Sequence, residues 1–378
     1  MIIKAFLRWA ETATASDRAK AATALAKAFL RSPPTDEQHR AAVHAMIHLL
    51  DDPSALVRQA LAETLAPSPM APRAVILALS EDQPDVACHV LTFSPVLTDA
   101  DLVDLCGRGS AMARGLIAAR PNLSRSVAAA IAEVGDIGEI LILLENSSAH
   151  VSRYSLKRLA ERFGREASVR NLLLAREALP AEARDLLIGH VSALLAQSGL
   201  VRSTMSPSRI AHVTREASEL AALTLAKETQ SEDLPLLVEH LAASERLTPA
   251  FLMHALCSGR IEFFAAAMTY LTGLEERRVR SLMATARHHA VRALYESAGL
   301  ERAICEVFAE ATLLWRDLSH RGGQMGGESI CSALMQKFKR NPDRMSAVDE
   351  LLDLVESLQL SEERQLARSF ASEAAIAA

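Results

Sequence analysis

Apolar residues recur along the first half of the chain at the i, i+3, i+4 spacing that places them on one face of an α-helix. In the stretch 49–66, LLDDPSALVRQALAETLA, such a face is formed by Val57, Leu61 and Leu65 and follows an acidic turn. Asp or Ser at a helix start can accept hydrogen bonds from free N–H groups, and Pro53 suits a first turn because no donor is needed there. The pattern predicts that one helix ends at this turn and another begins beyond it.

A similar stretch, LLENSSAHVSRYSLKRLA, returns at 143–160, and the offset from 49–66 is 143 − 49 = 94 residues. Because 94 is close to three times 31, intervening copies are expected. Two are present: LSEDQPDVACHVL at 79–91, with one residue deleted, and the weaker GSAMARGLIAARPNLS at 109–124. A period near 30 residues is typical of a solenoid of stacked helix pairs, in which each pair buries its apolar face against its neighbours.

We therefore predict an all-α protein, with a HEAT-like α-solenoid of helix pairs at 1–198 and an all-helical C-terminal domain at 208–378. The polar segment 199–207 is predicted to be the linker between them. No segment alternates with a period of two residues for long enough to indicate a strand. In the C-terminal half the apolar spacing predicts a series of helices, including a single helix over 275–297.

Composition supports close-packed helices. Hydrophobic residues make up 50% of the 378 residues but aromatic ones 4%, so Ala, Leu, Val and Ile supply most of the apolar content. The net charge of −5 lacks the positive excess expected of a general nucleic-acid binder. The five cysteines are scattered without a CxxC pair, which indicates reduced core residues and a cytoplasmic location. No apolar run reaches the ~18 residues that a transmembrane helix needs.

Several stretches resemble one bacterial family. They include FLRWAETATASDRAKAATALAKAFL near the start, LLDDPSALVRQALAETLA, SPVLTDADLVDL at 94–105, ALCSGRIEFFAAAMTYLTGL at 255–274 and ALYESAGL at 293–300. Together they are similar to an uncharacterised, mostly alphaproteobacterial HEAT-like-repeat family, catalogued as domain of unknown function 2336. The resemblance covers the chain from its first residue to about residue 300. It implies a helical, HEAT-like fold and supplies no activity, cofactor or catalytic residue.

The sequence shows no assembled catalytic or metal site. His44 and His48 lie one helical turn apart, but no third ligand is placed near them by the sequence. No Ser/His/Asp or Cys/His set can be assembled from the motifs. We therefore expect a protein that is not an enzyme and has no metal or other cofactor.

Two functions from different classes remain. The first is a scaffold or adaptor whose repeats bind another, unidentified protein through exposed positions on the second helix of each pair. The candidate contacts are Arg58, Gln59 and Glu63 in the first repeat, and Arg153 and Lys157 in the fourth.

The alternative is phosphate or nucleic-acid binding by two basic stripes at 153–170 and 277–292. On a helix over 275–297, Arg280 and Arg287 could share one face. The candidate anion ligands are Arg158, Arg162, Arg280, Arg287 and Arg292. Glutamates interleaved with both stripes would neutralise part of this charge.

Overall fold

The computed structural model describes residues 9, 11–31, 36–285, 287–320, 329–338 and 346–377. Within these residues every regular element is a helix, which confirms the predicted all-α, helical-repeat fold class. The chain divides into two compact units, Met1–Ala183 (unit 1) and Arg184–Ala378 (unit 2), which are described separately. Their boundary lies earlier than residue 198. The predicted linker, 199–207, contains the short helix α14 (Gly199–Thr204), which Ser198 caps through its side chain.

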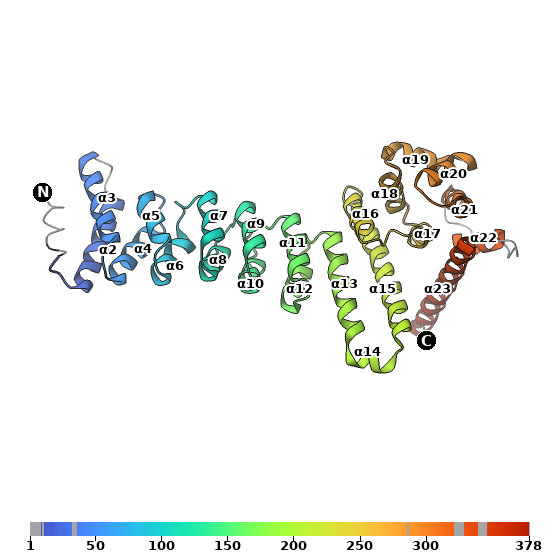
Figure 1. The fold of residues 1–378 in the computed structure, drawn as a ribbon, viewed down its shortest axis with the longest axis horizontal. Coiled ribbons are helices and arrows are strands. Elements are labelled where there is room, and N and C mark those ends of the chain that lie inside the picture. Colours follow the sequence, from blue (N-terminus) through green and yellow to red (C-terminus); the bar gives the residue numbers. More distant parts are fainter. Residues whose placement is uncertain are drawn as a thin grey trace. The chain divides into compact units, whose positions relative to one another are not determined.

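Unit 1 consists of two rows of helices, visible in Figure 1. In row A each helix packs on the next; its members are α2 (Ala15–Arg31), α4 (Ala55–Leu65), α6 (Pro84–Phe93), α8 (Ala111–Ala118), α10 (Ile137–Glu145) and α12 (Ala167–Leu174). Row B contains α3 (Asp36–Leu50), α5 (Arg73–Ser80), α7 (Asp99–Arg108), α9 (Arg125–Val134) and α11 (Arg153–Phe163). Each row B helix forms a pair with the row A helix that follows it in the chain.

The helices of unit 1 are short, so their stability depends on caps and on packing against both neighbours. The Ser110 and Ser124 side chains accept hydrogen bonds from the third N–H of α8 and α9, and Thr98 and Asp101 form a capping box at the start of α7. On α4 the apolar face predicted from the sequence is completely buried: Val57, Leu61 and Leu65 are 0% exposed. Repeat stacking therefore forms one continuous core.

The structure corrects the phase of the sequence repeat. The stretches at 49–66, 79–91 and 109–124 each include a passage from a row B helix to a row A helix. The stretch at 143–160 instead passes from α10, in row A, to α11, in row B. It is half a repeat out of step, because the apolar spacing of one amphipathic helix does not distinguish the two rows.

Unit 2 contains most of α13 (Ala181–Gln197) and the helices from α14 onward (Figure 1). These are α15 (Pro207–Glu228), α16 (Leu234–Ala243), α17 (Pro249–Cys257), α18 (Ile261–Thr272), α19 (Glu276–Ala284), α20 (His288–Ser297), α21 (Arg302–His320), α22 (Ile330–Lys337) and α23 (Ser346–Ala377). α13 begins directly after a turn at Leu179-Pro180.

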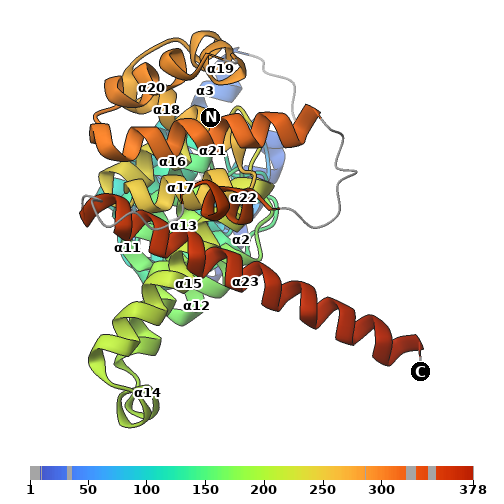
Figure 2. The same cartoon turned by 90° about the vertical axis from the view of Figure 1, so that its right-hand side faces the viewer.

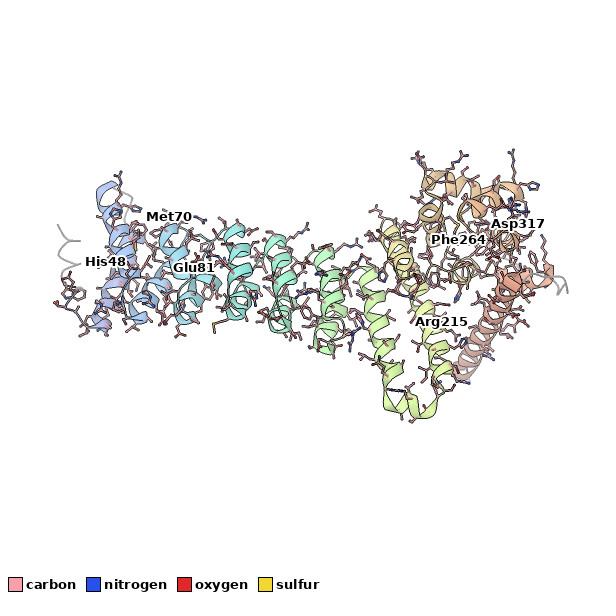
Figure 3. The ribbon with its side chains drawn as sticks, in the orientation of Figure 1. His48, Met70, Glu81, Arg215, Phe264 and Asp317 are labelled. Carbon is pink, nitrogen blue, oxygen red and sulfur yellow. The ribbon has the colours of Figure 1, made fainter. Side chains whose placement is uncertain are left out.

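The core of unit 2 surrounds α17, whose residues are all buried from Phe251 to Cys257. α17 packs on α18, α21 and α23. Beside it, the rings of Phe264, Tyr295 and Phe308 lie with centroids 5.5 to 6.2 Å apart, and Phe264 is labelled in Figure 3. The buried Tyr295 hydroxyl forms a hydrogen bond with Thr312, so this large side chain has its polar atom satisfied.

The prediction of one helix over 275–297 is wrong, because α19 ends at Ala284 and α20 begins at His288. Val279, Met283, Arg287 and Val291 are spaced four residues apart, so one continuous helix would place Arg287 on the same face as buried Val279 and Met283. The break instead places Arg287 at the exposed start of α20, with extended backbone angles.

Candidate functional site: the open step between α6 and α8

Ion pairs join the N-terminal ends of successive row A helices. The fourth residue of α2, α4 and α8 is an arginine, and each arginine binds a carboxylate at the start of the next row A helix. The pairs are Arg18 with Asp52 (2.7 Å), Arg58 with Asp82 (2.6 Å) and Arg114 with Glu139 (3.2 Å). We call these contacts the arginine rungs.

Each rung is partly buried, since none of the six side chains is more than 15% exposed. Each arginine also donates to a backbone carbonyl before its own helix, as Arg58 does to Asp52 at 2.5 Å. Burial by itself favours the neutral form of Asp82. Hydrogen bonds from Arg58 and the Gln83 N–H outweigh burial and hold the pKa of Asp82 below its usual value. The rungs are therefore structural.

The C-terminal ends of row A are joined by a second set of contacts. A polar side chain just beyond α8, α10 and α12 donates to the last carbonyls of the preceding row A helix. Arg120 donates to Leu91 and Ser94 (2.6 and 2.7 Å), Asn146 to Ala118 and Arg120 (both 2.8 Å), and Arg176 to Leu144 and Asn146 (2.7 and 3.2 Å). These carbonyls have no intrahelical partner, and the helix dipole favours a cation there.

Of the remaining row A helices, α12 has Arg170 as its fourth residue, whereas α6 and α10 lack the arginine. The fourth residue of α10 is Ile140, which is 0% exposed and fills the space with apolar atoms. The fourth residue of α6 is Ala87, and Gly109 and Ser110 stand before α8 where a carboxylate would complete the rung. The step from α6 to α8 is thus open at this end, and a groove of about 440 Å³ lies there.

The groove has an apolar wall and a polar end. Leu91, Leu105 and Met112 contribute to the wall, and Met112 is 54% exposed. At the other rungs, a backbone carbonyl just before the helix accepts a hydrogen bond from the arginine. The Asp82 carbonyl occupies the equivalent position before α6, and it accepts no hydrogen bond within the described residues. Glu81, labelled in Figure 3, lies at the rim and pairs with Arg108 at 2.6 Å. The site therefore offers acceptors and apolar surface together.

Three of the residues predicted to contact a partner lie on α4, the row A helix that precedes α6. Arg58 is held within the rung to Asp82, so its guanidinium has a role inside the chain. Gln59 donates to Glu63 at 3.0 Å, and Glu63 lies 3.4 Å from His89 on α6. Glu63 is exposed and stays a predicted contact together with half-buried Gln59.

Arg153 and Lys157 lie on α11, which is the first helix of its pair and belongs to row B. They were expected on a second helix, because the 143–160 stretch was aligned half a repeat out of step. Arg153 is exposed and Lys157 is half-buried. The structure therefore does not place them in the same row as Arg58, Gln59 and Glu63.

The arginines predicted to bind anions are mostly engaged within the chain. Arg158 pairs with Glu133, Arg162 donates to the carbonyls of Ala132 and Gly135, Arg280 pairs with Glu262 and Glu276, and Arg292 pairs with Glu296 and Glu306. Arg287 is exposed and has no carboxylate partner in the described part of the chain. Four of the five candidate anion ligands are therefore engaged within the chain and less available to a phosphate backbone.

Sequence reasoning missed the open step, although a signal for it was present. The alignment of 79–91 with 49–66 pairs Ala87 with Arg58, while Arg114 retains the arginine in the next copy. Because the carboxylate that binds each arginine lies in the next repeat, the sequence alone does not show that these arginines form ion pairs. The alanine at position 87 is therefore recognised as a missing rung only from the structure.

Among the described residues, no group of three or more His, Cys, Asp or Glu side chains could hold a metal ion. No helix there is long and apolar enough to span a membrane. Four of the five cysteines, Cys106, Cys257, Cys305 and Cys331, are buried.

The stacked rows and the contacts that join their ends define an all-α helical-repeat protein. The chain belongs to the family described as "Uncharacterised protein conserved in bacteria (DUF2336)", which matches residues 86–347. The family predicted from the sequence is thus confirmed. Its match begins within α6, after the stretch at 49–66 that also suggested it, and continues beyond residue 300. No curated protein and no solved structure matches the chain.

Proposed function

We propose that this chain is a non-enzymatic scaffold or adaptor, acting in the cytoplasm, whose helical repeats bind another protein. The partner places an arginine side chain in the open step between α6 and α8. The observation that carries this proposal is the missing rung at Ala87, with its groove of about 440 Å³.

The neighbouring rungs support an arginine as the group that the open step accepts. At Arg58 and Arg114 the aliphatic stem lies in a partly buried position while the guanidinium binds a backbone carbonyl and a carboxylate. At the open step the chain keeps a carbonyl acceptor at Asp82, and Ala87 supplies no arginine stem to it; the Glu81 carboxylate at the rim already pairs with Arg108. An arginine from a partner has the length, the apolar stem and the fork of donors that this arrangement lacks.

Exposed Met112 at the groove favours a protein partner. Methionine adapts its shape to an incoming side chain and is frequent at surfaces that bind peptides. Phosphate or nucleic acid is the weaker candidate, because four of the five arginines predicted to bind anions contact carboxylates or carbonyls of this chain.

Selection of peptides tests the proposal. A random library of dodecapeptides is selected against the full-length chain, and the affinity of enriched sequences is measured by fluorescence polarisation. We expect enriched peptides to share one arginine whose replacement by citrulline, a neutral isostere, weakens binding by about tenfold or more. Peptides without a common arginine, or with unchanged affinity after replacement, would contradict the proposal.

A further inference from the structure

Unit 2 contains a larger cleft that is unrelated to the repeats of unit 1. It has a volume of about 1100 Å³ and is lined by the ends of α13 and α14, by α15, and by the connection between α16 and α17. Figure 2 shows α14 at the tip of the hairpin formed by α13 and α15. Met205, Pro207 and Ile210 give the cleft apolar surface. This volume is sufficient for a ligand of several hundred daltons.

One end of the cleft is held in place by a buried carboxylate. Asp185 on α13 is 1% exposed, and its Oδ2 lies 2.5 Å from Nη1 of Arg246 and 3.0 Å from Nε2 of His240 on α16. Arg246 also donates to the Ser218 carbonyl on α15 at 3.0 Å. The Arg246 side chain therefore ties three helices together where it lines the cleft, so the cleft is preformed.

Four other charged residues line the cleft: Arg202, Arg215, Glu219 and Glu245. None of the four forms an ion pair with another of them or with any other residue in the described ranges. Arg215, labelled in Figure 3, lies one helical turn before Glu219 on α15. Two guanidiniums and two carboxylates therefore line one cleft without forming ion pairs among the described residues.

Glu245 has an unusual backbone conformation for its residue type. It follows α16 at the position where the chain turns with a left-handed residue, and its φ is 55°. Its N–H donates to Ala242 and the next N–H donates to Leu241. The same two hydrogen bonds close α17 and α20, where glycine stands at the equivalent position with φ of 69° at Gly259 and 84° at Gly299.

A left-handed backbone is unfavourable for any residue with a Cβ, and glycine avoids this penalty. A Cβ added to either glycine would meet only open space, so crowding does not explain the choice between residues. A glutamate at this turn therefore costs stability, and its side chain faces a cleft. Strain kept at a binding site is a recurrent sign that the side chain has a function.

Glu219 is the second carboxylate of the cleft. Burial raises the pKa of its carboxyl above the usual value, and the nearby Arg215 and Arg246 guanidiniums counteract part of this effect. A cationic ligand group would offset the unfavourable burial of this carboxylate.

We propose that this cleft binds a zwitterionic ligand with an apolar body, of the short-peptide class, through Arg202 and Arg215 at its carboxylate and Glu219 and Glu245 at its ammonium group. The apolar side chains of the ligand lie against Met205 and Ile210. Opposite charges that are not paired with each other complement a ligand whose own two charges are separated. This site is independent of the proposed scaffold function of unit 1.

Isothermal titration calorimetry of the full-length chain with trileucine tests the proposal. Trileucine has both free termini and an apolar body; the matched controls are N-acetyl-trileucine and trileucine amide, each of which lacks one charge. We expect trileucine to bind and each capped form to bind at least about tenfold more weakly. Absence of binding by trileucine, or equal binding by the capped forms, would overturn the proposal.

Variants then connect binding to the cleft. Arg215→Ala is expected to weaken trileucine binding about tenfold without affecting folding, because this side chain is exposed. Glu245→Gly is expected to weaken binding and to raise the Tm by about 2–4 °C, since it removes the strained backbone. If Glu245→Gly binds trileucine more weakly although its Tm is higher, the loss of binding does not come from a loss of folding. Unchanged binding in both variants would refute the proposed site.

Discussion

Arg58 on α4 and Asp82 before α6 form a two-pronged ion pair between successive repeats, with N–O distances of 2.6 and 3.0 Å. Both side chains are 15% exposed. Arg58 and Asp82 thus contribute to how the repeats stack, although Arg58 had been predicted to contact a partner.

A double-mutant cycle measures this contribution. We expect Arg58→Ala and Asp82→Ala to show a coupling of about 2 kcal/mol in the free energy of unfolding, measured by urea titration. The matched control is the pair of Arg158 and Glu133, whose side chains are 42% and 43% exposed. Coupling there should be below about 1 kcal/mol because solvent screens exposed pairs. Equal coupling in the two cycles would contradict a structural role for the rung.

The second set of contacts between repeats predicts a different effect. Arg120 is buried enough to lower the pKa of its guanidinium, and it donates to the carbonyls of Leu91 and Ser94. Arg120→Met keeps the length and the packing of the stem but leaves these carbonyls without their donors. We expect a loss of about 1–3 kcal/mol in unfolding free energy. Arg125→Met, at an exposed position on α9, should change stability by less than about 0.5 kcal/mol. Similar losses in both variants would refute the capping role.

His254 predicts the pH dependence of unit 2. It is 7% exposed on α17, and burial lowers its pKa from 6.5 to about 4. The folded state therefore holds His254 neutral where the unfolded chain already binds a proton. This contribution to the stability of the folded state is therefore fully present above pH 6.5. It declines as the pH falls from 6.5 toward 4, because protonation of His254 then favours the unfolded chain.

Unfolding by urea at pH 7.5 and pH 5 tests this. From pH 7.5 to pH 5, the free energy of unfolding of the wild type should fall by about 2 kcal/mol more than that of the His254→Leu variant, which has no titrating group at this position. Comparing the two proteins removes the contribution of all other carboxylates and histidines. An identical pH dependence in both would show that His254 is not held neutral.

Features that depend on local patterns could be predicted from the sequence. The apolar face of α4, the serine caps of α8 and α9 and the turn at Leu179-Pro180 follow from side-chain spacing, capping chemistry and proline geometry. The family assignment followed from local stretches as well.

Features that depend on tertiary contacts were not predictable. The row to which α11 belongs is set by its neighbours, and Arg153 and Lys157 were misplaced for that reason. The break before Arg287 avoids burying its charge, which becomes evident once the buried faces of α19 and α20 are known. Glu245 and the cleft of unit 2 required backbone angles and the arrangement of four elements.

The central claim, that the open step between α6 and α8 receives an arginine from a partner, is tested most directly by completing the rung. Ala87→Arg combined with Ser110→Asp supplies both the stem and the carboxylate, so the chain itself should fill the groove and keep its stability. Ala167→Arg, at an exposed position of α12 in the same unit, adds an arginine without closing the groove.

The measurement is the affinity of the selected arginine-containing peptides for these two proteins, by fluorescence polarisation at moderate salt. We predict that the Ala87→Arg, Ser110→Asp protein loses binding by at least about tenfold while the Ala167→Arg protein binds like the wild type. Equal binding by all three proteins would contradict the account.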